Sequence, residues 1–317
     1  MELASHLVWE GILLLIVVVL AIVVVAGPLS LSEPSVLWYP MAALGLLTAG
    51  FALSLRTATP NLAIGGLSGA AGLAYAKLVD NDWPAPVAAG CAVLIVVVVG
   101  AVMGLLVGLT SAPAWAVSLG MLAVSQAVLF GVFEAVSVPI RDADGAIGKT
   151  GITVAAAIFV VVSIGGGVGW MALGPAGQAL LSANREAVDP ASWRPARLLG
   201  AMVGLTGSAL LAGVAGVVAA AYIHVATTID NGRLLPAIGA ALLGGVSVFG
   251  RRGGIAGTVL AVMVVSLAGM AVIDLHRWVQ LSLPAGAILV GLIVSWALER
   301  IAGPVTAPSV STGQPAG

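Results

Sequence analysis

The sequence predicts an all-α integral membrane protein, a glycine-rich bundle of about ten transmembrane helices. Three observations support this prediction. Hydrophobic residues make up 60% of the 317-residue chain, charged residues make up only 8%, and 42 glycines are spread through the apolar runs. Soluble globular domains average about 25% charged residues. A water-soluble fold could not cover this much apolar surface, because it has too few polar groups to face the solvent.

Ten apolar runs reach or approach the length of a membrane span, which is about 20 residues because each helical residue rises about 1.5 Å. They are residues 8–26, 36–55, 60–78, 85–110, 113–133, 152–173, 197–223, 234–249, 255–273 and 282–301. We interpret the first run as a membrane helix and not as a removed signal peptide, because no Lys or Arg precedes it.

Two of these runs are irregular. The run at 60–78 is rich in glycine and small polar residues, and the run at 234–249 is short. Membranes accommodate short or broken helices only where neighbouring protein or a cavity satisfies the backbone. Both runs are therefore candidates for elements that line a transport pathway.

The positions of Lys and Arg predict the orientation. With a cytoplasmic N-terminus and ten spans, seven basic residues fall on the cytoplasmic side and five outside, as the positive-inside rule favours. The inner set is Arg56, Arg185, Arg194, Arg197, Arg251, Arg252 and Arg300, and the outer set is Lys77, Arg141, Lys149, Arg233 and Arg277. We expect both termini in the cytoplasm, one transmembrane domain over residues 1–302, and a disordered cytoplasmic tail over 303–317.

Glycines recur every fourth residue within several runs, as at Gly100, Gly104 and Gly108, and at Gly200 and Gly204. Small residues at this spacing let helix backbones approach closely in lipid. We therefore expect close helix packing at these positions.

Several kinds of chemistry are missing from the sequence. No ionisable residue lies at the centre of a predicted span, although ion-driven carriers usually place acids or histidines there. The three histidines lack metal-ligand spacing and Cys91 is the single cysteine, so we predict no metal and no cofactor. No phosphate-binding Walker A loop is present, so we expect no enzymatic ATP hydrolysis by this chain. The net charge of -1 gives no reason to expect a nucleic-acid partner.

Residues 174–196 form the longest polar connection inside the membrane domain. Ser182 or Asn184 could cap a short helix there, and Pro190 and Pro195 interrupt the segment. If the protein moves a solute uphill without an internal charge, a partner must supply the energy from the cytoplasm. This segment is large enough to dock such a partner, although an ordinary solvated loop remains the alternative.

The segment Ala183-Asn184-Arg185-Glu186-Ala187-Val188 resembles the coupling loop of sugar-type ABC permeases, the family that imports ribose, xylose, arabinose and galactose, where Gly-Gly-Asn-x-Glu-Ala-Ala is typical. The chain then departs from the family, because Asp189 and Pro190 follow where a basic residue is usual.

Further stretches resemble the same family in the same order. Gly244-Gly245-Val246-Ser247 is similar to its Gly-Gly-Thr-Ser, and residues 250–258 are similar to its Gly-Gly-x-Gly-x-Ile-x-Gly-Thr. Residues 61–66 resemble Ile-Asp-Leu-Ser-Val-Gly, with Asn61 where Asp is usual, and residues 113–120 resemble Pro-Ala-Phe-Ile-x-Thr-Leu-Gly.

The resemblance implies a permease subunit in a bacterial cytoplasmic membrane. Its partners would be cytoplasmic ABC ATPase subunits, a second permease copy or a paralogue, an extracytoplasmic solute-binding protein and the lipid bilayer. The permease would import a small neutral polar solute, with a monosaccharide as the first candidate, by alternating access.

Three groups of residues are candidate sites. The ATPase-coupling loop comprises Asn184, Arg185, Glu186 and Ala187, and the cytoplasmic glycine turn comprises Gly250, Arg251, Arg252, Gly253 and Gly254. The pathway candidates are uncharged polar residues within spans, namely Asn61, Ser68, Ser118, Ser125 and Gln126. Each pathway candidate also fits a helix–helix hydrogen bond, which is common in membranes.

Three alternatives stay open. A branched-chain amino acid ABC permease shares the coupling logic and the glycine-rich character. A secondary carrier would work without ATP, and the lack of a carboxylate at the centre of any span weighs against it. A membrane scaffold or sensor would not need the long connection at 174–196.

Overall fold

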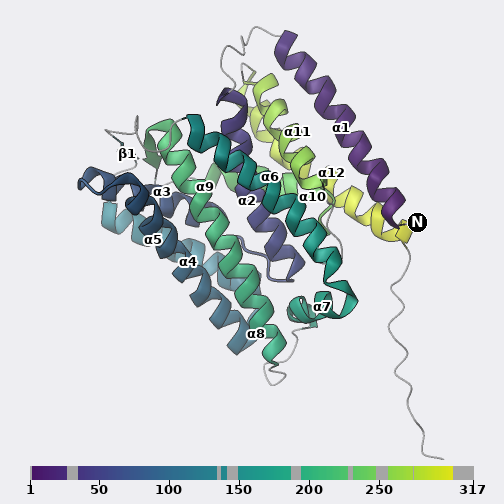
Figure 1. Cartoon of the computed structure of the whole chain (residues 1–317), viewed down its shortest axis with the longest axis horizontal. Coiled ribbons are helices and arrows are strands. Elements are labelled where there is room, and N and C mark those ends of the chain that lie inside the picture. Colours follow the sequence, from purple (N-terminus) through teal and green to yellow (C-terminus); the bar gives the residue numbers. More distant parts are fainter. Residues whose placement is uncertain are drawn as a thin grey trace, which may run out of the picture.

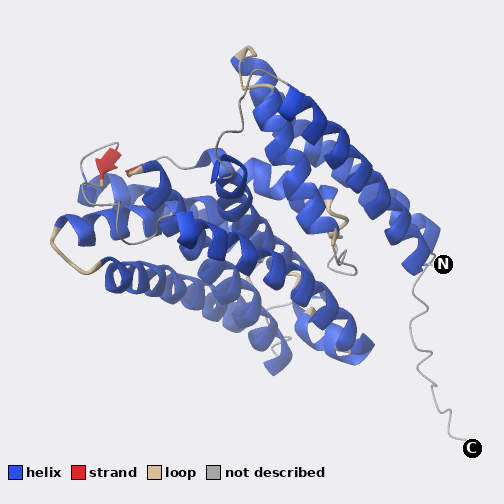
Figure 2. Cartoon of the chain, turned by 45° about the horizontal axis from the view of Figure 1, so that its top comes forward, coloured by secondary structure: helices blue, strands red, loops and turns tan. Residues whose placement is uncertain are grey.

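The computed structural model describes residues 2–26, 35–133, 137–140, 149–186, 194–227, 231–247, 256–273 and 275–302, and helices dominate this part of the chain (Figure 2). The α-helices are α1 Glu2–Ala26, α2 Ser35–Arg56, α3 Ile64–Asp80, α4 Ala85–Thr110, α5 Ala114–Phe133, α6 Lys149–Ala172, α7 Gly174–Leu181, α8 Pro195–Ala201, α9 Gly207–Ile223, α10 Leu234–Leu243, α11 Gly257–Ala271 and α12 Arg277–Ala302. The prediction of an all-α membrane protein is confirmed.

Seven helices in the described part of the chain are long and apolar enough to cross a bilayer. They cover Leu7–Ala26, Trp38–Arg56, Ala85–Thr110, Ala114–Gly131, Gly151–Ala172, Pro195–Ile223 and Arg277–Ala297. The predicted count of about ten is not confirmed. Each predicted run does contain a helix, but α3, α10 and α11 have only 17, 10 and 15 residues. At about 1.5 Å per residue they are shorter than a hydrocarbon core of about 30 Å.

Burial differs sharply between the candidate spans. The span in α2 is 78% buried and the long span Pro195–Ile223 is 67% buried, whereas the spans in α1 and α12 are 17% and 11% buried. Figure 1 shows α2 and α9 inside the bundle, with α1 at its edge. The exposed sides of α1, α5 and α12 carry aliphatic residues such as Leu15, Val128 and Ile293. Such surfaces suit contact with lipid or with another apolar protein surface.

Glycines allow the central helices to touch. A Cβ atom added to Gly216 of α9 would collide with the Ser68 carbonyl of α3, and one added to Gly72 would lie 3.1 Å from the Gly216 oxygen. The glycine repeat in α4 allows a similar close contact with the neighbouring helical span. A Cβ atom on Gly104 would lie 2.9 Å from Met202 Sδ, and one on Gly108 would lie 2.7 Å from Leu198 Cα. The expectation of close packing at the α4 repeat is confirmed.

A π-helix, η2 Met202–Thr206, joins α8 to α9 within one continuous helical span of 29 residues. Its Gly204 packs directly against the Thr57 and Thr59 hydroxyl groups, which leave no room for a Cβ atom. π-helices are rare and are often found at functional sites.

Two three-residue strands, β1 Ser137–Pro139 and β2 Val225–Thr227, pair antiparallel with Val138 opposite Ala226. The pair ties the segment after α5 to the end of α9. We did not predict it, because three residues are too few to display the alternation that marks a strand.

Candidate functional site

The first part of the predicted docking loop forms α7 followed by the 3-10 helix η1 Ala183–Glu186, and residues 187–193 lie outside the described residues. We call residues 174–186 the docking segment. Gly174 turns the chain between α6 and α7 with a φ of +64°, a conformation that favours glycine. Gln178 Nε2 donates to the Trp170 carbonyl at 2.8 Å and so ties α7 to α6.

The docking segment is also fastened to α8. Asn184 Nδ2 donates to the Arg197 carbonyl oxygen at 2.9 Å. The Leu181 carbonyl packs so closely on Gly200 that a Cβ atom there would collide with it. The docking segment and the first turns of α8 therefore form one mechanical unit.

The structure separates the four predicted coupling residues. The Asn184 amide serves an internal bond, and Arg185 is exposed. Glu186 ends η1, but its side chain lies outside the described residues, as does all of Ala187. Contact with an ATPase stays a prediction for all four, and among the two described side chains Arg185 is the one that faces outward.

A cavity of about 360 Å³ lies beside the docking segment. It is lined by Ala179, Ser182, Ala183, Arg185, Arg194, Ala196 and Arg197. Three of these residues are arginines, and a guanidinium group can bond to a carboxylate on a partner surface.

The break between α10 and α11 is held by two neighbouring residues of α1, which we call the α1 clamp. Trp9 Nε1 donates to the Leu243 carbonyl at the end of α10, at 2.8 Å. Glu10 Oε1 accepts the backbone N–H groups of Ala256 and Gly257 at the start of α11, at 3.1 and 3.0 Å. Helix ends leave such groups without partners inside the helix. The α1 clamp therefore supplies hydrogen-bond partners to a carbonyl group at the end of α10 and to two N–H groups at the start of α11.

The sequence did not predict the α1 clamp, because Glu10 lies near one end of the first apolar run, where an acid needs no special explanation. The available signal was an acidic residue inside residues 8–26, which are otherwise apolar. An acid in such a run needs a partner in a membrane protein, but the sequence does not show that the partner is 246 residues away.

The glycine motif at 244–247 forms the turn after α10. Gly245 has a φ of +79°, and a Cβ atom on Gly244 would lie 2.8 Å from Thr258 Cα. Val246 and Ser247 are buried. The predicted glycine turn itself, Gly250 to Gly254, lies outside the described residues.

Two of the predicted pathway residues form a buried polar junction between α2, α3, α5 and α9. Asn61 Nδ2 donates to Ser208 Oγ at 2.7 Å, and Asn61 Oδ1 accepts the Ala63 N–H at 3.0 Å. Ser118 Oγ accepts the Leu62 N–H at 3.1 Å. Asn61 and Ser118 are each 0% exposed. Both side chains form hydrogen bonds that join neighbouring helices, and neither side chain is exposed to an open cavity.

The other three pathway candidates lie on α3 and α5. Ser68 lines a small cavity of about 70 Å³ between α3 and α9. Ser125 Oγ donates to the Leu122 carbonyl of its own helix at 2.8 Å and faces Gly66. Gln126 has an amide nitrogen that is buried without a hydrogen-bond partner among the described residues. A transport role for these residues stays a prediction.

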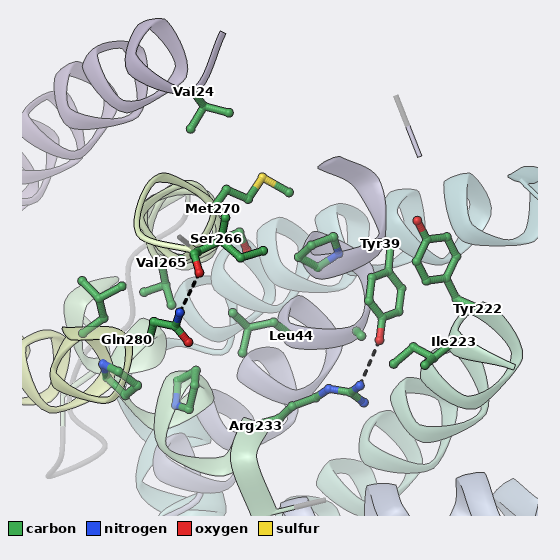
Figure 3. A pocket seen from close by; sticks show the side chains of 17 residues that line it. Val24, Tyr39, Leu44, Tyr222, Ile223, Arg233, Val265, Ser266, Met270 and Gln280 are labelled. Carbon is green, nitrogen blue, oxygen red and sulfur yellow. Dashed lines mark hydrogen bonds between the residues drawn. The ribbon is translucent and has the colours of Figure 1, made fainter. Parts of the chain in front are cut away.

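A cavity of about 600 Å³, the large cavity, lies between the helix ends far from the docking segment (Figure 3). Tyr39 of α2 and Tyr222 of α9 stack at 4.0 Å between ring centroids. Arg233, just before α10, donates from Nη2 to the Tyr39 hydroxyl at 2.9 Å. Gln280 of α12 donates to the Ile273 carbonyl at 2.7 Å. No sequence motif predicts this cavity, because the residues that line it lie far apart in the chain.

Comparison of the chain with protein-family models, with curated proteins and with solved structures finds no match. The family suggested by the sequence motifs therefore stays a prediction.

Proposed function

We propose that the chain is the transmembrane permease subunit of an ATP-driven ABC importer for a small neutral polar solute, with a monosaccharide as the first candidate. The partners in this proposal are cytoplasmic ATPase subunits, a second permease copy or paralogue, and an extracytoplasmic solute-binding protein. The motifs at 183–188 and 244–258 first suggest this role.

One structural observation supports the proposal most strongly, the continuous connection between the docking segment and the large cavity. The docking segment is bonded to α8 through Asn184 and Arg197. The same helical span continues from Pro195 to Ile223 without interruption, a length of about 43 Å at 1.5 Å per residue. Its last residues, Tyr222 and Ile223, line the large cavity. A displacement of the docking segment would therefore reach the opposite end of the bundle.

The close contacts along this span favour transmission of a rigid movement. Met202 and Leu198 pack on the α4 glycines, Gly204 packs on the Thr57 and Thr59 hydroxyl groups, and Gly216 packs on the α3 backbone. Tightly packed interfaces switch between discrete arrangements and do not deform gradually. Alternating access requires an element of this kind.

The distribution of acids favours ATP over an ion gradient as the energy source. Within the seven candidate spans of the described chain, Glu10 is the single acidic residue. Its carboxylate accepts two backbone N–H groups at the start of α11. A carboxylate that caps a helix is occupied by a structural task, whereas a proton relay must exchange its proton during each cycle.

Reconstitution tests the proposal. The chain is placed in proteoliposomes with candidate ABC ATPases from the same genome, and ATP hydrolysis is measured for the wild type and for the double variant Asn184→Ala, Glu186→Arg. We expect the wild type to stimulate turnover and the double variant to lose the stimulation. Asn81→Ala is the matched control, because Asn81 is an exposed asparagine that follows α3.

Two results would contradict the proposal. One is that no ATPase associates with the folded wild-type chain. The other is that the double variant and the Asn81→Ala control stimulate hydrolysis equally while both retain the wild-type unfolding temperature.

A further inference from the structure

The π-helix η2 joins two parts of the span Pro195–Ile223 that are bonded to different neighbours, and Figure 1 shows these parts, α8 and α9, in line. Helix α8 is bonded to the docking segment, because Asn184 donates to the Arg197 carbonyl. The first turn of α9 is bonded to the loop after α2, because Asn61 Nδ2 donates to Ser208 Oγ at 2.7 Å. The π-helix therefore lies between two fixed points of the span.

The geometry of a π-helix leaves room for a change of register. Its hydrogen bonds join residues five apart and not four, so it holds one more residue in a turn than an α-helix does. If Met202–Thr206 became α-helical, the span would lengthen by about 1.5 Å and α8 would turn by about 100° against α9, the rise and rotation of one residue. Each residue of α8 would then take the direction that its predecessor has now. Leu199, which is 46% exposed, would turn toward the side on which Leu198 contacts Gly108 of α4.

The hydroxyl group of Thr206, the last residue of the π-helix, favours the α-helical register. Its oxygen is buried without a hydrogen bond among the described residues, which is destabilising. A threonine in an α-helix can donate to a carbonyl group three or four residues earlier. Thr48 of α2 does so, since its Oγ1 donates to the Leu44 carbonyl at 2.7 Å. In α-helical geometry the Met202 carbonyl would be the corresponding acceptor for Thr206, so conversion would supply the missing bond.

Packing at the middle of the π-helix favours the present register. Gly204 packs directly on the hydroxyl groups of Thr57 and Thr59, which bond to each other at 2.8 Å. On the side of α4, the π-helix and α8 face Gly104 and Gly108, which have no side chain to block a rotation of α8. One register is thus favoured by packing and the other by a hydrogen bond, and a two-state element needs such a balance.

From these observations we propose that the π-helix is a register switch, which converts to an α-helix and turns α8, with the docking segment, by about 100° against α9. The inference concerns the chain alone and does not depend on solute import. A switch at this place gives the docking segment two discrete orientations. A partner that binds one orientation more tightly would shift the equilibrium toward it.

The distance between two spin labels tests the inference in the purified full-length chain. One label is attached at Leu199→Cys of α8 and the other at Leu94→Cys of α4, both at exposed positions, in a Cys91→Ser background. The α4 label reports the position of α9, because Gly100 packs on Ala209. A side chain about 5–6 Å from the helix axis moves by about 8 Å when α8 turns by about 100°. We expect double electron–electron resonance to give two distances for the wild type, the minor one from the α-helical register.

Three variants should change the two populations differently. Thr206→Val keeps the shape of the side chain and removes the hydroxyl group, so it should lower the minor population about tenfold, as expected for one buried hydrogen bond. Thr206→Ser is the matched control, because it retains the hydroxyl group and should keep both distances. Deletion of Val203, which is 38% exposed, removes the extra residue. It should leave the major distance alone, because an α-helix then holds α8 in its present direction.

Three results would overturn the inference. One is a single distance for the wild type. Another is the same ratio of the two distances in Thr206→Val and Thr206→Ser. The third is a folded Val203 deletion variant that retains both distances. If the deletion variant does not fold, the two Thr206 variants decide the question.

Discussion

Removal of the Glu10 side chain should loosen the junction between α10 and α11. In Glu10→Ala the N–H groups of Ala256 and Gly257 lose their acceptor, while Trp9 still holds the Leu243 carbonyl. The start of α11 is then expected to fray, because its first N–H groups have no partner within the helix.

The size of the effect follows from the two bonds. A hydrogen bond to a charged group contributes about 1.5–3 kcal/mol, and loss of a helix N-cap costs about 0.5–2 kcal/mol. The Glu10 side chain is only half-buried, so water can reach part of the vacated site. The expected loss in the free energy of unfolding is therefore about 2 kcal/mol, a value that both the hydrogen-bond range and the N-cap range include. Glu10→Gln retains an oxygen acceptor and should lose only about 1 kcal/mol.

Two assays measure this change. Unfolding by titrated dodecyl sulfate in detergent micelles gives the free energy of unfolding. Local opening is measured by maleimide labelling of Ser247→Cys in a Cys91→Ser background, because Ser247 is only 2% exposed and lies at the junction. A local loss of about 2 kcal/mol should raise the labelling rate about 30-fold, since each 1.4 kcal/mol is tenfold.

Ile12→Ala is the control on the same helix, because Ile12 is 43% exposed and lies only two residues beyond Glu10. It should change neither assay appreciably. The reasoning is refuted if Glu10→Ala labels at the wild-type rate, or if Glu10→Gln is as destabilising as Glu10→Ala.

Two further substitutions test the packing at the centre of the bundle. Gly216→Ala should destabilise the fold by about 3 kcal/mol, because the new methyl group would collide with the Ser68 carbonyl, whereas Gly131→Ala should be neutral because its surroundings are open. Dodecyl sulfate unfolding distinguishes them, and equal midpoints would contradict the α3–α9 contact. Asn61→Leu should cost about 1–3 kcal/mol because it removes the bond to Ser208 in a fully buried site, and wild-type stability of this variant would show that the bond contributes little.

The sequence predicted where the helices lie, but it did not predict which of them are long enough to cross a bilayer. Each apolar run contains a helix because hydrophobic composition reports burial in lipid or protein. Hydrophobic composition does not distinguish a membrane span from a shorter buried helix such as α10. This helix has ten residues and ends where Gly244 packs on Gly257. That ending depends on a contact between segments that a local pattern does not reveal.

The candidate site could be predicted only where its signal is local. The docking segment followed from a polar stretch between apolar runs, but the expected cap was wrong. Helix α7 ends at Leu181, so Ser182 follows it, and the Ser182 hydroxyl and the Asn184 amide donate to the carbonyl groups of Gln178 and Arg197. The large cavity combines Tyr39, Tyr222 and Arg233, three residues from three segments with no common motif. The roles of Asn61 and Ser118 were left open between pathway and packing, and their complete burial favours packing.

The energy source of transport is the most direct test of the central claim. Proteoliposomes that contain the chain, its ATPase and its solute-binding protein are assayed for uptake of radiolabelled ribose, xylose, arabinose, galactose and leucine. Uptake is compared with and without ATP on the ATPase side, in the presence of ionophores that collapse every ion gradient. We predict that one of the sugars is taken up only with ATP and that ionophores have no effect. Uptake that needs an ion gradient and proceeds without ATP would contradict the account.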